Sequence, residues 1–203
     1  MRTSAWILGF LLPLFSGASF SADEKSGVND EGFIQSWLVL APIPLAANQS
    51  GEDGLAKDQL KDEAKLKPKV GDKIKVGDTE LTWKEYVAKE HLLDFNDFLG
   101  KVTEDSVGYA VTFIVAPEEL KGIKMKTGSD DQCKVFLNGK EVFKYTDERA
   151  LDKDDDTTEV TLNKGVNVLV VKVVNVKEDW SFCVRFTDKD DKPITKLQSK
   201  TSE

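Results

Sequence analysis

Residues 166–176 read VNVLVVKVVNV, and this stretch decides the fold. Hydrophobic side chains occupy both of its alternating sets of positions, which is typical of a β-strand that is covered on both faces. The stretch follows residues 163–165, whose sequence NKG indicates a hairpin-like turn, and the strand-like residues 160–162 precede that turn. We therefore predict that residues 166–176 form the central strand of a sheet.

Further strand-like segments, either rich in β-branched and aromatic residues or alternating between apolar and polar ones, lie around this strand. Residues 138–139 are Asn-Gly, a dipeptide that favours the positive φ angles of a tight hairpin. Short strands separated by turn signals predict an all-β fold, an antiparallel β-sandwich of jelly-roll type with one or two short helices. The predicted strands are 106–116, 122–127, 133–137, 140–145 and 181–186.

Two segments of the first half have a less decisive pattern. Residues 55–66 have helical spacing and are expected to form a short helix. Residues 83–99 fit an amphipathic helix, but they fit equally well a strand at 82–88 followed by one helical turn at 95–99, and periodicity alone does not decide between the two.

The N-terminus has the pattern of a signal peptide. Arg2 precedes the apolar run 6–15, and small residues follow that run. The run is shorter than the ~20 residues needed to span a bilayer, so we expect cleavage between residues 18 and 23, a secreted or periplasmic location and no membrane span in the mature chain. The predicted organisation is a signal peptide at 1–22, a linker at 23–32, a β-sandwich domain at 33–194 and a flexible tail at 195–203.

Composition excludes several classes of function. The 203 residues include 28 Lys and Arg against 36 Asp and Glu, which gives a formal charge of −8. Nucleic-acid binding is not expected, because it requires a basic face that neutralises phosphates. The chain has one His and two Cys, so zinc sites built from several such residues are not expected, and no cofactor is predicted.

Three blocks of the second half carry a resemblance. Residues 128–143 (GSDDQCKVFLNGKEVF), 163–175 (NKGVNVLVVKVVN) and 180–186 (WSFCVRF) resemble the galactose-binding-like jelly-roll superfamily. That superfamily includes the sugar-binding-like domain of family 2 glycoside hydrolases, and the chain is also similar to secreted modules of planctomycete-type bacteria. In those modules a Trp-x-Val-Leu-x-Pro segment, here residues 37–42, precedes the sandwich.

The resemblance implies a bacterial β-sandwich over residues 33–194, and it favours an extended conformation at 82–99. The sequence departs from the pattern at two places. Phe136 stands where the family usually has Trp, and Ile43-Pro44 stands where Pro-Phe is expected.

Four residues near the predicted strand ends are candidates for ligand contact: Trp180, Tyr145, Asp130 and Asp131. An aromatic ring presents apolar area to the C–H face of a sugar, and neighbouring carboxylates fix its hydroxyls. Trp180 is the best outward-facing ring, because it follows the polar residues 177–179. Asp130 and Asp131 are also weak calcium candidates, but Asp commonly bonds to nearby backbone N–H groups and shapes a turn instead.

A second weak calcium candidate has the D-x-D-x-D spacing of a calcium loop, at Asp152, Asp154 and Asp156. The EF-hand interpretation fails, because positions 6 and 12 of that loop hold Thr and Asn instead of Gly and Glu. A solvated acidic loop, partly neutralised by Arg149 and Lys153, is the alternative. We expect no metal to be required for folding.

The sequence has no pattern of a catalytic site. His91 is the single imidazole, and neither a nucleophile elbow nor a catalytic Cys signature surrounds any Ser or Cys. Pairs of carboxylates are too frequent in this chain to indicate a glycosidase. Cys133 is expected on the core face of its strand and Cys183 on the opposite face of its own strand, so we predict two unbridged thiols.

The sequence therefore predicts a secreted, non-catalytic binding module, with neutral or cationic carbohydrate as the first ligand class. Polar, acidic loops on a rigid scaffold suit hydroxyl-rich ligands, whereas the net charge repels anions. The alternative is a structural or protein-interaction module with no small ligand. A glycoside-acting enzyme is the third possibility.

Overall fold

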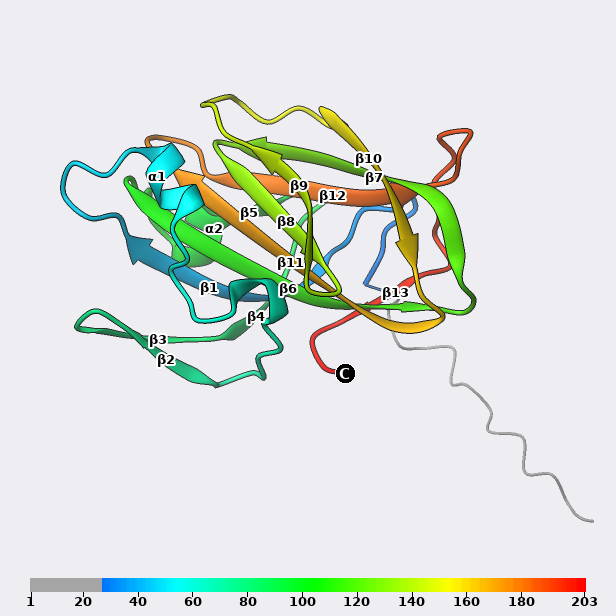
Figure 1. The fold of residues 1–203 in the computed structure, drawn as a ribbon, viewed down its shortest axis with the longest axis horizontal. Coiled ribbons are helices and arrows are strands. Elements are labelled where there is room, and N and C mark those ends of the chain that lie inside the picture. The colour runs from blue at the N-terminus through cyan, green and yellow to red at the C-terminus, as the bar shows by residue number, and fades with distance from the viewer. Residues whose placement is uncertain (1–26) are drawn as a thin grey trace, which may run out of the picture.

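The computed structural model describes residues 27–203, which form a β-sandwich of two antiparallel sheets (Figure 1). The predicted signal peptide and residues 23–26 of the predicted linker lie outside the described residues. The larger sheet has the order β4(Lys84–Val87), β1(Ser36–Pro44), β6(Ser106–Ala116), β11(Gly165–Asn175), β8(Cys133–Leu137) and β9(Lys140–Tyr145), with β13(Gln198–Lys200) also paired to β6. The smaller sheet has the order β10(Asp156–Leu162), β7(Leu120–Asp130), β12(Ser181–Thr187) and β5(Leu93–Asp94).

The predicted fold class, an all-β antiparallel sandwich with one or two short helices, is confirmed. The two α-helices of the described residues are α1(Gly51–Ala56) and α2(Phe95–Leu99). The Asn138-Gly139 turn joins β8 to β9, and both residues have positive φ angles, 51° and 81°. Both angles are as the tight hairpin requires.

Strand β11 is central and covered on both faces, as its sequence predicts. It pairs with β6 along its whole length and with β8 on its other edge. Leu169, Val171 and Val173 belong to the inner core between the two sheets. Val168 and Val170, on the alternate positions, belong to a second core on the outer face of the larger sheet.

The segment 45–83 covers that outer face. It contains α1, a 3-10 turn at Glu63–Lys65 and a hairpin of β2(Lys73–Val76) and β3(Thr79–Thr82). Figure 1 shows the β2–β3 hairpin on the side of the larger sheet that is turned away from β7, β10 and β12. Leu55 and Leu60 of this segment are buried in the second core.

The predicted helix at 55–66 is wrong in its bounds. The helix begins earlier, because Ser50 and Asp53 form a reciprocal capping box at its N-terminus. Lys57 is extended, which ends α1, and Asp62 has a left-handed φ of 54° before the 3-10 turn. One continuous helix is therefore replaced by two short pieces joined by an irregular link.

Residues 82–99 adopt the extended alternative, with β4 and β5 followed by the single helical turn α2. The N-cap of α2 is Asp94, whose carboxylate accepts a hydrogen bond from the N–H of Asp97 at 3.0 Å. Gly100 ends the helix in a left-handed conformation with φ 69°.

The C-terminal residues differ from the flexible tail that the sequence predicts. Leu197 is fully buried, and β13 pairs with β6 beyond it. The hydroxyl groups of Ser199 and Thr112 lie 3.0 Å apart. The sequence could not indicate this strand, because one buried Leu followed by a three-residue strand is too short a pattern to stand out in a polar segment. Similarly, Val28 of the predicted linker is buried and pairs with Ile34.

No helix of residues 27–203 is both long enough and apolar enough to span a membrane.

Candidate functional site

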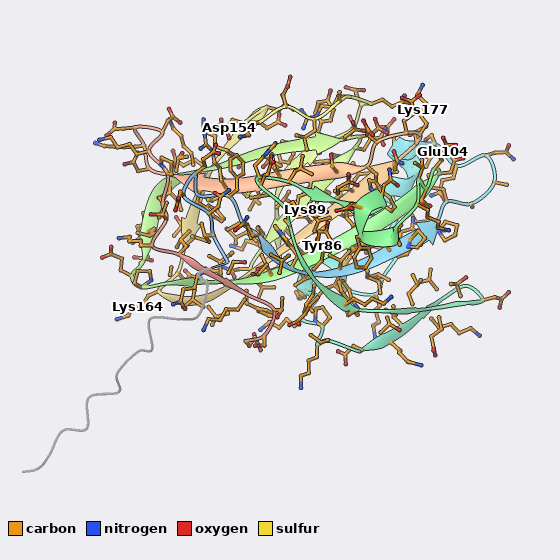
Figure 2. All side chains as sticks on the ribbon, turned by 180° about the vertical axis from the view of Figure 1, so that it is seen from behind. Tyr86, Lys89, Glu104, Asp154, Lys164 and Lys177 are labelled. Carbon is orange, nitrogen blue, oxygen red and sulfur yellow. The ribbon has the colours of Figure 1, made fainter. Side chains whose placement is uncertain are left out.

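The loops 131–132, 146–155 and 176–180 meet at one end of the sandwich and form a polar pocket, which we call the loop-end pocket. Its volume is about 300 Å³. Figure 2 shows Lys177 at this end of the molecule beside Glu104, with Asp154 further along the sandwich. The lining residues are Asp130, Asp131, Glu148, Arg149, Ala150, Lys177, Glu178 and Asp179.

Asp131 holds this pocket together. Its side chain is buried, and its two carboxylate oxygens accept hydrogen bonds from the backbone N–H groups of Arg149 at 3.2 Å and Val176 at 3.1 Å. The hydroxyl of Ser129 donates to its backbone carbonyl at 2.8 Å. One carboxylate therefore joins two loops. The sequence offered two roles for Asp131, calcium binding and turn shaping, and these hydrogen bonds correspond to turn shaping. The peptide bond between Asp130 and Asp131 is cis.

Asp130 is the carboxyl group of the pocket with an unusual protonation equilibrium. Burial, together with the neighbouring charges of Asp131, Asp179 and Glu178, raises its pKa to about 7, against a hydrogen bond from the backbone of Leu151 that lowers it. Both protonation states are therefore populated at neutral pH. Such a group can donate or accept a hydrogen bond, and a bound cation would favour its ionised form.

Arg149 occupies one side of the pocket, and its guanidinium lies 3.7 Å from the ring centroid of Tyr145. It also donates to the carbonyl of Ser129 at 3.1 Å and to the carboxylate of Asp156 at 2.6 Å. Tyr145 is half-buried, with one ring face covered. This candidate ring therefore supports Arg149 and does not offer that face to a sugar.

The prediction that Trp180 faces outward is wrong. Trp180 is fully buried, and its ring stacks on Phe95 with centroids 4.4 Å apart. A Cβ atom on Gly108 would lie within 2.8 Å of both rings, so the glycine makes room for the pair. The polar residues 177–179 form a turn, and the strand alternation then directs Trp180 to the inner core, where α2 supplies its partner.

The carboxylates of the D-x-D-x-D segment do not converge on one point. Asp154 pairs with Arg185, whose Nε donates to it at 2.8 Å, and Asp156 pairs with Arg149. At Asp152 it is the backbone N–H that takes part, and it donates a hydrogen bond to the carboxylate of Asp155 at 3.0 Å. Among residues 27–203 no group of three or more His, Cys, Asp or Glu is arranged to hold a metal ion.

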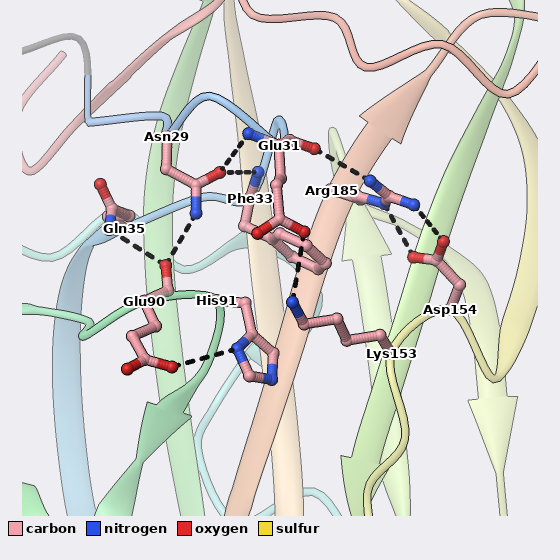
Figure 3. A network of polar contacts seen from close by, with 9 residues as sticks. All are labelled: Asn29, Glu31, Phe33, Gln35, Glu90, His91, Lys153, Asp154 and Arg185. Atoms are coloured by element: carbon pink, nitrogen blue, oxygen red, sulfur yellow. Dashed lines mark hydrogen bonds and ion pairs between the residues drawn. The ribbon is translucent and has the colours of Figure 1, made fainter.

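His91 takes part in a structural cluster around the buried ring of Phe33 (Figure 3). Its ring contacts Phe33 edge to face with centroids 5.6 Å apart, and Arg185 lies 5.0 Å from the same ring. Burial and the nearby Lys153 lower the pKa of His91. The imidazole therefore helps to attach the N-terminal segment to the sandwich.

Cys133 and Cys183 are both buried free thiols, as predicted. Cys133 faces the inner core with Val135. Cys183 is on the opposite side of its sheet, where residues 152–154 cover it: a Cβ atom on Gly128 would lie 2.1 Å from the carbonyl oxygen of Asp152 and 3.1 Å from the sulfur of Cys183. Burial raises the pKa of both thiols, so neither is a reactive nucleophile at neutral pH.

Sequence reasoning missed a buried charged cluster under the segment 45–83. Lys172 of β11 is fully buried, and its Nζ lies 3.1 Å from Glu63 Oε2. The hydroxyl of Tyr109 donates to the same oxygen at 2.5 Å. Tyr109, Lys172 and Lys134 are cross-strand neighbours on β6, β11 and β8. The signal was present as one Lys in the middle of an apolar strand, which requires a buried partner.

No family model matches the chain, and no curated protein matches it. A solved structure, the crystal structure of the PA14 domain of the MpAFP antifreeze protein, has 11% sequence identity and a TM-score of 0.41 over 85% of this chain and 92% of that chain. This likeness is too weak to carry an argument about function, and the galactose-binding-like relation stays a prediction.

Proposed function

We propose that this protein is a secreted, non-catalytic binding module that recognises neutral or cationic glycans at the loop-end pocket. In this proposal residues 1–22 are a signal peptide and residues 33–194 form a domain of the galactose-binding-like type. The observation that carries the proposal is the convergence of carboxylates and cations on a small pocket at the end of a rigid sandwich.

The chemistry of the pocket favours hydroxyl and amine groups. Asp130, Glu178 and Asp179 accept hydrogen bonds from sugar hydroxyls or from the ammonium group of an amino sugar. Arg149 and Lys177, which also line the pocket, donate to hydroxyl oxygens. Neither of the predicted rings, Tyr145 and Trp180, lines this pocket, so recognition rests on hydrogen bonds. We therefore expect weak binding, with a Kd on the order of 0.1–1 mM.

A glycan array followed by affinity electrophoresis tests this proposal. Asp130→Asn should weaken retention by immobilised glycan, because the substituted group can no longer become ionised. Asp131→Asn is unsuitable as the test variant, because that carboxylate joins two loops. Asp147→Asn, an exposed change in the same loop that does not line the pocket, is the matched control and should leave retention unchanged.

Each measurement is repeated with calcium and with a chelator, since Asp130 and Asp131 are hard oxygen ligands. Retention that requires calcium would place a cation beside Asp130. Binding to a protein partner with no glycan retained would replace this proposal with a protein-interaction module. Glycoside turnover that is lost on mutation of one carboxylate would overturn the non-catalytic assignment.

A further inference from the structure

A second pocket lies on the outer face of the larger sheet, between the 3-10 turn at Glu63–Lys65 and strands β8 and β9. It shares no lining residue with the loop-end pocket, and its volume is about 280 Å³. We call it the outer-face pocket. The lining residues are Asp58, Asp62, Glu63, Ala64, Lys65, Lys134, Phe136 and Glu141.

Glu63 presents one bonded oxygen and one unbonded oxygen. Its Oε2 faces inward, toward Tyr109 and Lys172, and neither of these residues lines the pocket. Its Oε1 lies on the side of Lys134, which does line the pocket, and has no hydrogen-bond partner among the described residues. The side chain of Glu63 is only 3% exposed. An acceptor so deeply buried requires a donor.

Lys134 faces this oxygen across a gap. Its Nζ is 3.8 Å from Glu63 Oε1 and 3.9 Å from Glu141 Oε2, both longer than a hydrogen bond, and its side chain is 9% exposed. Because Glu63 Oε1 is buried, a hydroxyl oxygen can reach both charged groups, at roughly 2.8 Å from each, only when the side chain of Lys134 moves outward. A hydroxyl group suits this place, because it can donate to the carboxylate and accept from the ammonium group at once.

The rest of the pocket favours the same ligand chemistry. Phe136 lines the pocket but is only 6% exposed, and Lys134 Nζ lies 5.8 Å from its ring centroid, so the same outward movement of Lys134 would uncover apolar area for the C–H groups of a sugar ring or a polyol chain. Asp58, Asp62 and Glu141 are exposed acceptors for further hydroxyl groups. A simple amine would lack an acceptor for Lys134, and a simple carboxylate would lack a donor for Glu63.

We propose that the outer-face pocket is a second binding site, which takes a hydroxyl-rich small ligand of the sugar or polyol class. One hydroxyl of the ligand lies between Glu63 Oε1 and Lys134 Nζ, and the C–H face of the ligand lies against Phe136. The proposal does not depend on ligand binding at the loop-end pocket, because the two sites share no residue.

Amide chemical-shift titration by NMR tests this site, with sorbitol, methyl α-glucoside and methyl β-galactoside as probes. At least one probe should cause saturable shifts at the amides of residues 62–65 and 134–141. Lys134→Met should raise the Kd about tenfold, because one charge-assisted hydrogen bond is lost. Lys144→Met is the matched control, since Lys144 is the cross-strand neighbour of Lys134 and is exposed, and it should leave the Kd unchanged.

Glu141→Gln provides a second variant at an exposed position and should weaken binding without affecting the buried cluster. An absence of saturable shifts with all three probes would mean that only water occupies the gap and would overturn the proposal. Shifts confined to residues 130–131 and 176–180 would also overturn it, while supporting the loop-end proposal. Unchanged affinity in both Lys134→Met and Glu141→Gln would overturn it as well.

Discussion

The two faces of strand β11 are buried in different ways. On the inner face, apolar side chains such as Leu169 and Val171 meet the second sheet, whose backbone groups are paired within its own strands. On the outer face the cover is the irregular segment 45–83, and Lys172 stands among the valines. A sheet that packs on this strand needs only apolar contact, because its backbone groups are already hydrogen-bonded. An irregular segment also needs hydrogen-bond partners for its buried backbone groups.

Lys172 supplies such partners. Its Nζ donates to the carbonyl oxygens of Leu55 at 3.0 Å and Lys57 at 2.7 Å, where α1 ends. These carbonyls lack helical partners, and a cation at a helix C-terminus also interacts favourably with the helix dipole. Burial lowers the pKa of Lys172, and the charge of Glu63 acts in the opposite direction. The carboxylate of Glu63 therefore stabilises the charged form of this buried ammonium group.

The largest effect should come from breaking the outer cluster. Glu63→Ala should lower the free energy of unfolding by about 3–5 kcal/mol, because it leaves the buried charge of Lys172 without its counter-ion. Glu63→Gln should cost less, since an amide oxygen can still accept from Tyr109 and Lys172. Urea unfolding measures both variants. A loss below about 1 kcal/mol for Glu63→Ala would show that the cluster contributes little to stability.

A smaller effect should come from a matched pair of substitutions on β11. Val170 and Val171 are adjacent, fully buried and on opposite faces. Val171→Ala should cost about 2–3 kcal/mol, and Val170→Ala about 1–2 kcal/mol, because an irregular cover can relax into the space better than a sheet. Equal costs in urea unfolding would show that the outer cover is as rigidly packed as the inner one.

The sequence predicted the strands of the second half of the chain well. Strict alternation and the Asn138-Gly139 turn report local preferences of the backbone, and the strands of the second half lie where those signals indicate. Residues 167–175 are buried on both faces as expected, whereas Val166 at the start of the predicted strand is exposed. Neither the irregular form of the outer cover nor the buried position of β13 was predicted, because tertiary contacts far apart in sequence create both.

The candidate sites could be predicted only in part. The turn-shaping alternative for Asp131 follows from its residue type and holds in the structure. The direction of Trp180 was predicted wrongly, because polar neighbours in sequence do not reveal a stacking partner such as Phe95. The outer-face pocket was missed, because Glu63 and Lys134 are 71 positions apart in the chain and only the fold brings them together.

The smallest effect should appear as a pH dependence at the loop end. There the half-buried carboxyl group of Asp130 shares its pocket with Arg149 and Lys177 but, unlike Glu63 with Lys172, forms no ion pair with any described residue. The pKa of Asp130 is raised from 3.8 to about 7. The folded state therefore binds more protons than the unfolded state between those two values, and stability should fall as the pH rises through this range. The raised pKa of Asp131 adds to the same slope. Asp130→Asn should flatten the dependence of Tm on pH between about 4 and 7.

Asp191→Asn is the control of opposite sign. Hydrogen bonds from Lys124 and Lys126 lower the pKa of Asp191 to about 2, so its contribution to stability is present above the unfolded value of 3.8 and is lost as the pH falls toward 2. That substitution should leave the slope between about pH 4 and 7 intact. If Asp130→Asn also leaves the slope of Tm against pH unchanged, the pKa of Asp130 is not raised in the folded protein. Ionisation of Asp130 would then cost the folded state no stability, and the loop-end pocket would need no bound donor or cation to stabilise that charge.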